Sequence, residues 1–139
     1  MENKREIIQA IEECWNTTTP QSLICMKLVN YLEMTDPQEL EHISQASIQK
    51  ILGNKFNLEP IIESIQFLAG NYIKLLDINF EFIDENDDIF PLERGDIAEA
   101  RKIGVFAHPT TGDPVDNFEE KVFLYYQPNP KGLKALKHG

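Results

Sequence analysis

The amino-acid sequence predicts an α+β fold whose first half is helical and whose second half forms strands. Up to Gly70, apolar residues recur at spacings of three and four, which is typical of helices that bury one face. From Tyr72 the apolar residues alternate with polar ones, which is typical of a strand. The chain has 139 residues and is 42% hydrophobic, enough to form the core of one ordinary domain.

The predicted helices of the first half begin at recognisable start signals. The first covers residues 4–16. The second starts at Thr19-Pro20, where a side-chain acceptor precedes a proline in the first helical position, and runs to about Met34. Asp36-Pro37 repeats that signal and predicts a short helix through His42.

Two further helices are predicted before the change of period. Ser44 is the expected N-cap of one that ends at Leu52, with Gly53 in a left-handed conformation after it. Asn57 is the expected N-cap of the next, which ends at Gly70. The apolar stripes of these elements and of the following strand predict one shared core that includes Leu28, Ile51, Ile62, Ile65 and Phe80.

The second half is predicted to begin with a β-hairpin from about Tyr72 to Phe90, closed by the charged turn Asp84–Asp88. A short helix from Asp96 to Ile103 should follow. Short strand segments are then predicted at residues 105–107 and 122–126.

We expect residues 1–127 to form a single domain, because no linker or internal repeat divides them. Residues 128–139 are expected to be a flexible tail, since they combine prolines with Lys131, Lys134 and Lys137.

The charge balance bears on the class of partner. With 13 basic and 23 acidic residues the net charge is -10, which repels phosphate groups and anionic membranes. No stretch resembles a signal peptide or a membrane span. Cys14 and Cys25 both fall in helical apolar patterns and are interpreted as buried free thiols. These observations favour a cytoplasmic protein.

The residues that enzymes and metal sites need are not grouped in this sequence. Asp84, Asn86 and Asp88 have the spacing that begins a calcium loop, but Ile89 and Gly95 stand where that loop needs glycine and glutamate. Cysteines and histidines lack zinc-ligand spacing, and no glycine-rich phosphate loop follows a strand. We therefore expect no enzymatic activity, no cofactor and no metal.

The segments 47–53 and 57–68, followed by 70–73, resemble the paired helices and the helix-to-wing step of winged helix-turn-helix domains. The resemblance covers about residues 20 to 90, and the chain is similar to small winged-helix components of prokaryotic multi-protein operons, including defence systems. It implies a helical half followed by a two-stranded wing. In DNA-binding members, the third helix presents Arg, Lys, Asn or Gln to the major groove.

This chain departs from the DNA-reading pattern at both of those elements. The helix that corresponds to the third helix has no lysine or arginine, and the wing turn is acidic. We therefore predict a protein-interaction adaptor, or a subunit of a complex, that binds a partner with a basic surface. The predicted partner-binding residues are Glu59, Glu63, Gln66, Asp84, Glu85, Asp87 and Asp88.

Two alternatives remain open at this point. In one, the protein is a DNA-binding transcriptional regulator, in which a homodimer gathers Lys50, Lys55, Lys74 and the lysine tail on one face. In the other, its carboxylate surface mimics DNA and occupies a nucleic-acid-binding protein.

Overall fold

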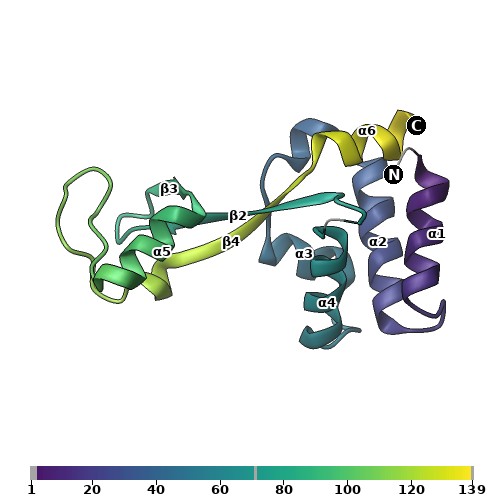
Figure 1. Ribbon diagram of the computed structural model, residues 1–139, viewed down its shortest axis with the longest axis horizontal. Helices are drawn as coiled ribbons and strands as arrows, with labels where there is room; N and C mark the ends of the chain where they lie inside the picture. The colour runs from purple at the N-terminus through teal and green to yellow at the C-terminus, as the bar shows by residue number, and fades with distance from the viewer. Residues whose placement is uncertain (1–2, 71, 139) are drawn as a thin grey trace. The chain divides into compact units, whose positions relative to one another are not determined.

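The computed structural model describes residues 3–70 and 72–138, and it has an α+β fold (Figure 1). The chain divides into two compact units. The first, called the helical unit, comprises Met1–Ile78 and Tyr126–Gly139, and the second, called the inserted unit, comprises Asn79–Tyr125. Both ends of the inserted unit join the helical unit through strands, and the single domain over residues 1–127 stays a prediction.

The helical unit begins with α1 (Lys4–Cys14) and α2 (Pro20–Met34), which lie side by side (Figure 1). The predicted start of α2 is confirmed, since the Thr19 side chain accepts a hydrogen bond from the Ser22 N–H and Pro20 is the first helical residue. A 3₁₀ turn, η1 (Pro37–Leu40), and the two-residue strand β1 (Ile43–Ser44) follow. The predicted helix through His42 is thus shorter than expected.

The next two helices are α3 (Gln45–Leu52) and α4 (Leu58–Leu68). Ser44 caps α3 as predicted, accepting a hydrogen bond from the Ser47 N–H at 3.1 Å. Gly53 follows α3 with a φ of 71°, a backbone conformation that glycine adopts without strain. Asn57 is the N-cap residue of α4 as predicted, but its side chain makes no hydrogen bond to the helix.

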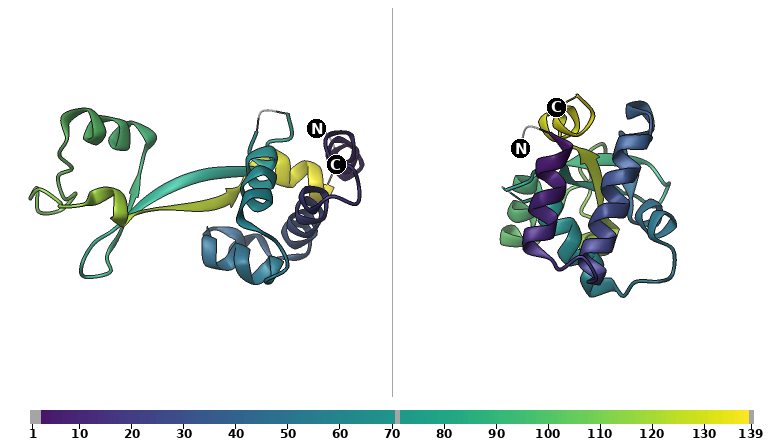
Figure 2. Two further views of the ribbon diagram at one scale, coloured as in Figure 1. Left: turned by 90° about the horizontal axis from the view of Figure 1, so that it is seen from below. Right: turned by 90° about the vertical axis from the view of Figure 1, so that its right-hand side faces the viewer.

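The last helix, α6 (Pro130–His138), replaces the flexible tail that was predicted for residues 128–139. It packs against α1 and α2 and lies across one end of them (Figure 2). Asn129 begins it by accepting hydrogen bonds from the Lys131 and Gly132 N–H groups. Ala135 and Leu136 are buried, and this apolar contact holds a segment whose lysines suggested a solvated tail.

The core of the helical unit is made by apolar side chains of all its helices. Leu28 and Ile65 belong to it as predicted, whereas Ile51 is half-buried and Ile62 is 44% exposed. The fully buried large side chains of this unit are Ile7, Ile11, Ile24, Leu32, Leu40, Ile48, Leu52, Ile61, Leu68, Leu75 and Leu76.

Four strands form one sheet in the order β1-β4-β2-β3, and two of them, β2 (Leu76–Ile83) and β4 (Val122–Pro128), run from one unit into the other. β3 (Ile89–Leu92) pairs with β2 in antiparallel register, with Phe82 opposite Phe90, so the predicted hairpin is confirmed. Its first strand begins at Leu76 rather than Tyr72, and Asn71, in the predicted helix-to-wing step, lies outside the described residues.

The inserted unit also contains α5 (Arg94–Ile103) and the 3₁₀ turn η2 (Phe118–Lys121). Gly104 ends α5 in the left-handed conformation, as predicted. Of the predicted strand at residues 105–107, the structure retains a single bridge between Ala107 and Pro114. The core of this unit is formed by Phe82, Ala100 and Phe106, with Phe90, Leu92, Val115 and Phe118 packed against them. Phe80 thus lies in this unit, half-buried, and not in the core predicted with Leu28.

Candidate interaction surfaces

The solvent-facing side of α4 is the first candidate surface. Ile61, Ile65 and Leu68 bury the opposite side of the helix, and α4 packs closely on α2. Ser64 is fully buried in the same stripe, where its hydroxyl donates to the Pro60 carbonyl at 2.7 Å and lies 3.3 Å from the Gln21 carbonyl. A serine thus occupies one core position of α4, while the apolar residues Leu58 and Ile62 are exposed.

The exposed side of α4 is therefore partly apolar. Leu58 is 63% exposed and Ile62 is 44% exposed, and the two lie one helical turn apart. Gln66 continues the same line, and Glu59 is exposed beside it. We call this surface the α4 face, defined by Leu58, Glu59, Ile62 and Gln66. Placing Ile62 in the core was an error, because the apolar arc of α4 is wider than the face it buries.

Glu63 lies at the margin of the α4 face. Its side chain is half-buried, and its Oε1 atom lies 3.4 Å from the Gln21 Nε2 atom, which donates to it. Of the predicted binding residues on α4, Glu59 and Gln66 are thus freely presented to solvent, and Glu63 is held by α2.

The acidic turn of the inserted unit is the second predicted surface, and its first residue has a structural role. The Asp84 carboxylate accepts hydrogen bonds from the Asn86 and Asp88 N–H groups, both at 2.9 Å. It also contacts His108 Nε2 at 2.9 Å, and the Asp84 side chain is only 8% exposed. Asp84 is therefore unsuited to contact a partner, whereas Glu85, Asp87 and Asp88 are exposed.

The Asp84–His108 pair was not predicted, and its geometry argues against acid–base catalysis. His108 Nδ1 accepts hydrogen bonds from the Thr110 and Thr111 N–H groups at 3.1 and 3.3 Å. Nε2 therefore carries the proton and donates a hydrogen bond to the Asp84 carboxylate. Both ring nitrogens are occupied, and the ring packs against Phe82 and Phe90. This pair fastens the loop after Ala107 to the acidic turn.

The hydrogen bond from His108 is the main cause that lowers the pKa of Asp84. Desolvation opposes it, and the Asp88 and Asn86 N–H groups add to the lowering. The lowered pKa means that the folded state favours the carboxylate. The Asp84 carboxylate therefore stabilises the folded state at pH values above the ordinary pKa of an aspartate, and this stabilisation is lost as the pH falls through the lowered pKa. We therefore expect acid to loosen the loop after Ala107 from the acidic turn.

The two groups of predicted partner-binding residues belong to different compact units. Glu59, Glu63 and Gln66 are in the helical unit, and the residues of the acidic turn are in the inserted unit. Residues 79–125 hold 12 acidic and 4 basic side chains, a net charge of -8, whereas the rest of the chain holds 11 acidic and 9 basic, a net charge of -2. The acidity of the protein is therefore concentrated in the inserted unit.

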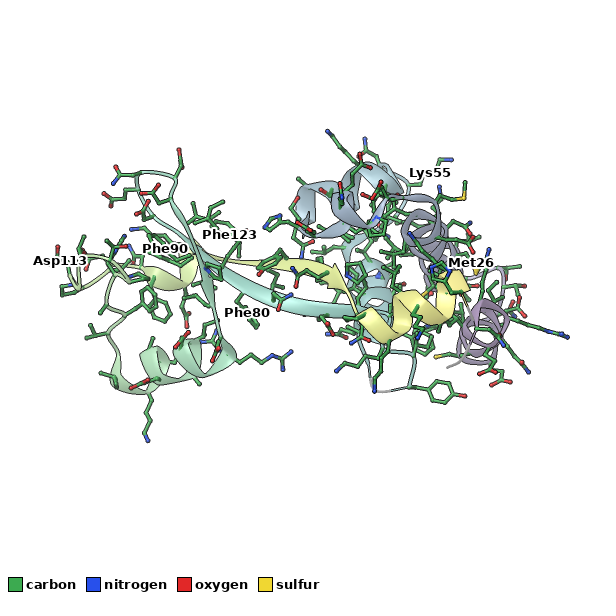
Figure 3. The ribbon with its side chains drawn as sticks, turned by 90° about the horizontal axis from the view of Figure 1, so that it is seen from above. Met26, Lys55, Phe80, Phe90, Asp113 and Phe123 are labelled. Atoms are coloured by element: carbon green, nitrogen blue, oxygen red, sulfur yellow. The ribbon has the colours of Figure 1, made fainter. Side chains whose placement is uncertain are left out.

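The lysines of the alternative DNA-binding hypothesis all lie in the helical unit. Lys50 on α3, Lys55 in the turn before α4 and Lys74 before β2 are exposed. Figure 3 labels Lys55. Of the lysines expected in the tail, Lys137 donates a hydrogen bond to the Thr35 carbonyl at 2.9 Å, so it helps to hold α6.

The two cysteines are free thiols that differ in exposure. Cys25 is buried, and burial raises the pKa of its thiol to about 11, which disfavours the nucleophilic thiolate. Cys14 is exposed at the end of α1, so its predicted burial is wrong. Among residues 3–70 and 72–138, no group of three His, Cys, Asp or Glu side chains is arranged to hold a metal ion. Over the same residues, none of the helices is long and apolar enough to span a membrane.

Comparison with family models, with curated proteins and with solved structures finds no match for this chain.

Proposed function

We propose that this protein is a non-enzymatic interaction module that docks on a partner protein through the α4 face. The observation that carries the proposal is the composition of this face, where exposed Leu58 and Ile62 stand beside Glu59 with no basic residue on the helix. Apolar side chains gain free energy when a partner covers them, and the carboxylate favours a basic surface around the contact. Such a module would act as an adaptor or subunit of a multi-protein complex in the cytoplasm.

The order of elements supports a winged-helix assignment for the helical unit. In a winged helix, a first helix is followed by a short strand, two helices and two longer strands, and the short strand pairs with the last one. Here α2, β1, α3, α4, β2 and β4 follow in that order, and the sheet order β1-β4-β2 has the same pairing. In this proposal the wing is the whole inserted unit, not the hairpin alone.

The α4 face also explains why we favour a protein partner over DNA. A recognition helix in the major groove presents hydrogen-bonding side chains to bases and basic ones to phosphates. Here the corresponding positions hold Leu58, Glu59 and Ile62, and of the exposed residues on this face only Gln66 suits base contacts. Lys50 and Lys55 lie before α4 and would have to supply phosphate contacts for the regulator alternative.

We expect the wild-type protein to show no saturable binding to labelled duplex DNA at physiological salt, because few cations are available to release counterions. Fluorescence anisotropy of duplexes of mixed sequence measures this. Glu59→Lys provides the matched control, since it places a cation on the exposed face of α4 and should increase non-specific binding. Sub-micromolar binding by the wild type that weakens with salt and is lost in Lys55→Glu would establish the DNA-binding regulator instead.

A further inference from the structure

The sheet of the inserted unit has one covered face and one uncovered face. Phe82 packs with Ala100 of α5 and with Phe106, so α5 and the loop after it cover the side to which Phe82 points. Phe80 points the same way, since side chains two apart in a strand share a face, and Arg94 of α5 lies 5.9 Å from its ring centre.

The opposite face is set by the strand register. Ile83 and Ile89 are paired across β2 and β3, and both alternate with the core residues Phe82 and Phe90. In β4, Phe123 alternates with Val122 and Leu124. All three residues line a cavity together with Phe80, so the side to which Phe123 points follows from the alternation and from Figure 3. Figure 3 shows Phe80 and Phe123 on opposite sides of the paired strands. Ile83, Ile89, Pro91 and Phe123 therefore share the face turned away from α5, called here the open sheet face.

The open sheet face carries exposed apolar side chains around Glu81, which lies opposite Pro91 on the same face and is only 6% exposed. Ile89 is 55% exposed and Phe123 is 47% exposed, and Pro91 is also exposed. Pro91 has no N–H group, which makes β3 a poor template for an added strand at the sheet edge. A partner would therefore contact side chains on the face rather than extend the sheet.

The surroundings of this face select the charge of the partner. Ile89 directly follows Asp87 and Asp88, which form no ion pair among the described residues. Glu85 lies in the same turn, and its Oε1 atom is 3.6 Å from the Lys121 Nζ atom. The inserted unit has a net charge of -8, so a second copy of it would be repelled. A basic segment would be attracted.

We propose that the open sheet face binds an amphipathic helix of a partner protein, with apolar residues over Ile89 and Phe123 and lysine or arginine toward Asp87 and Asp88. A helix on this face would complete a three-layer arrangement with the sheet between it and α5. This site lies in a different unit from the α4 face and stands without it.

The test uses the full-length protein labelled with ¹⁵N and a synthetic amphipathic helix of leucine and lysine as the probe. We expect backbone chemical-shift changes to cluster on β2, β3 and β4 around Ile83, Ile89 and Phe123. The double variant Ile89→Ser, Phe123→Ser should weaken the affinity by about tenfold or more, as expected when exposed anchors are removed. Ile103→Ser is the matched control, because Ile103 is 64% exposed at the end of α5 and its loss should leave the affinity unchanged.

Charge is tested separately from apolar contact. Asp87→Asn and Asp88→Asn should weaken peptide binding and reduce its dependence on salt. Asparagine is chosen because it tolerates the positive φ of 63° at residue 87. The same peptide with glutamate in place of lysine should not bind. Absence of binding by the lysine peptide, shift changes on α5 or the helical unit, or unchanged affinity in the double variant would overturn the proposal. Self-association that Phe123→Ser abolishes would show that a second copy occupies the face.

Failure of this site can be distinguished from failure of the proposed function. Leu58→Ser alters the α4 face alone and should leave peptide binding to the open sheet face unchanged. Loss of peptide binding in Leu58→Ser would contradict the independence of the two surfaces.

Discussion

Replacing Gly132 by alanine is expected to destabilise the helical unit by about 1–3 kcal/mol, the usual cost of overpacking a closely packed site. A Cβ atom at this position would lie 2.5 Å from the Lys74 carbonyl oxygen and 2.9 Å from the Leu75 Cα atom. Both are backbone atoms that cannot move aside as a flexible side chain can. We therefore expect α6 to be displaced, with loss of the contacts of buried Ala135 and Leu136.

The sign of this effect is informative, because alanine stabilises an unconstrained helix by up to about 1 kcal/mol relative to glycine. Gly95 is the matched control. It lies in α5, and a Cβ atom there would meet no other atom within 4 Å. Urea unfolding followed by circular dichroism should show Gly95→Ala neutral or stabilised and Gly132→Ala destabilised. If both variants gained stability, the close approach of α6 to residues 74 and 75 would be wrong.

Phe82→Ala is expected to destabilise the inserted unit by about 3–5 kcal/mol, the usual cost of truncating a fully buried aromatic side chain. Phe82 is 1% exposed, and its ring centre lies 5.0 Å from that of Phe106 and 5.6 Å from that of His108. So small a unit has little other core to compensate for the cavity. We expect it to unfold while the helical unit stays folded.

Amide hydrogen exchange measures this separation. Protection should be lost in residues 79–125 of Phe82→Ala and retained in α2 and α4. Phe123→Ala is the control, since this phenylalanine is 47% exposed and its truncation should change protection little. Loss of protection in both units together would show that they unfold as one cooperative body.

Local features of this fold could be predicted from the sequence because they depend on neighbouring residues. Thr19-Pro20 and Ser44 begin helices as their side chains dictate, and the alternation around Phe80 identifies a strand. The helix at the C-terminus shows where such reasoning fails. Asn129 followed by Pro130 has the form of a helix start, but the lysines suggested a solvated tail.

The features that were missed depend on contacts between distant parts of the chain. β2 passes from the helical unit into the inserted unit, and a period of two in the sequence does not reveal which core each side chain joins. The contact of Asp84 with His108, across 24 residues, removes one predicted binding residue from solvent. Ile62 was assigned to the core because it is apolar, whereas the polar residue Ser64 lies in the buried stripe with Ile61 and Ile65.

The central claim is that the α4 face binds a protein, and site-specific photocrosslinking tests it most directly. A photoreactive phenylalanine analogue placed at residue 58 replaces a side chain that is 63% exposed, so it should leave the fold intact. The same analogue at Lys27, exposed on α2, is the control. In cells of the native host we predict a discrete protein adduct from residue 58 that Glu59→Lys weakens, and none from residue 27. Adducts to DNA from residue 58, or identical protein adducts from both positions, would contradict the account.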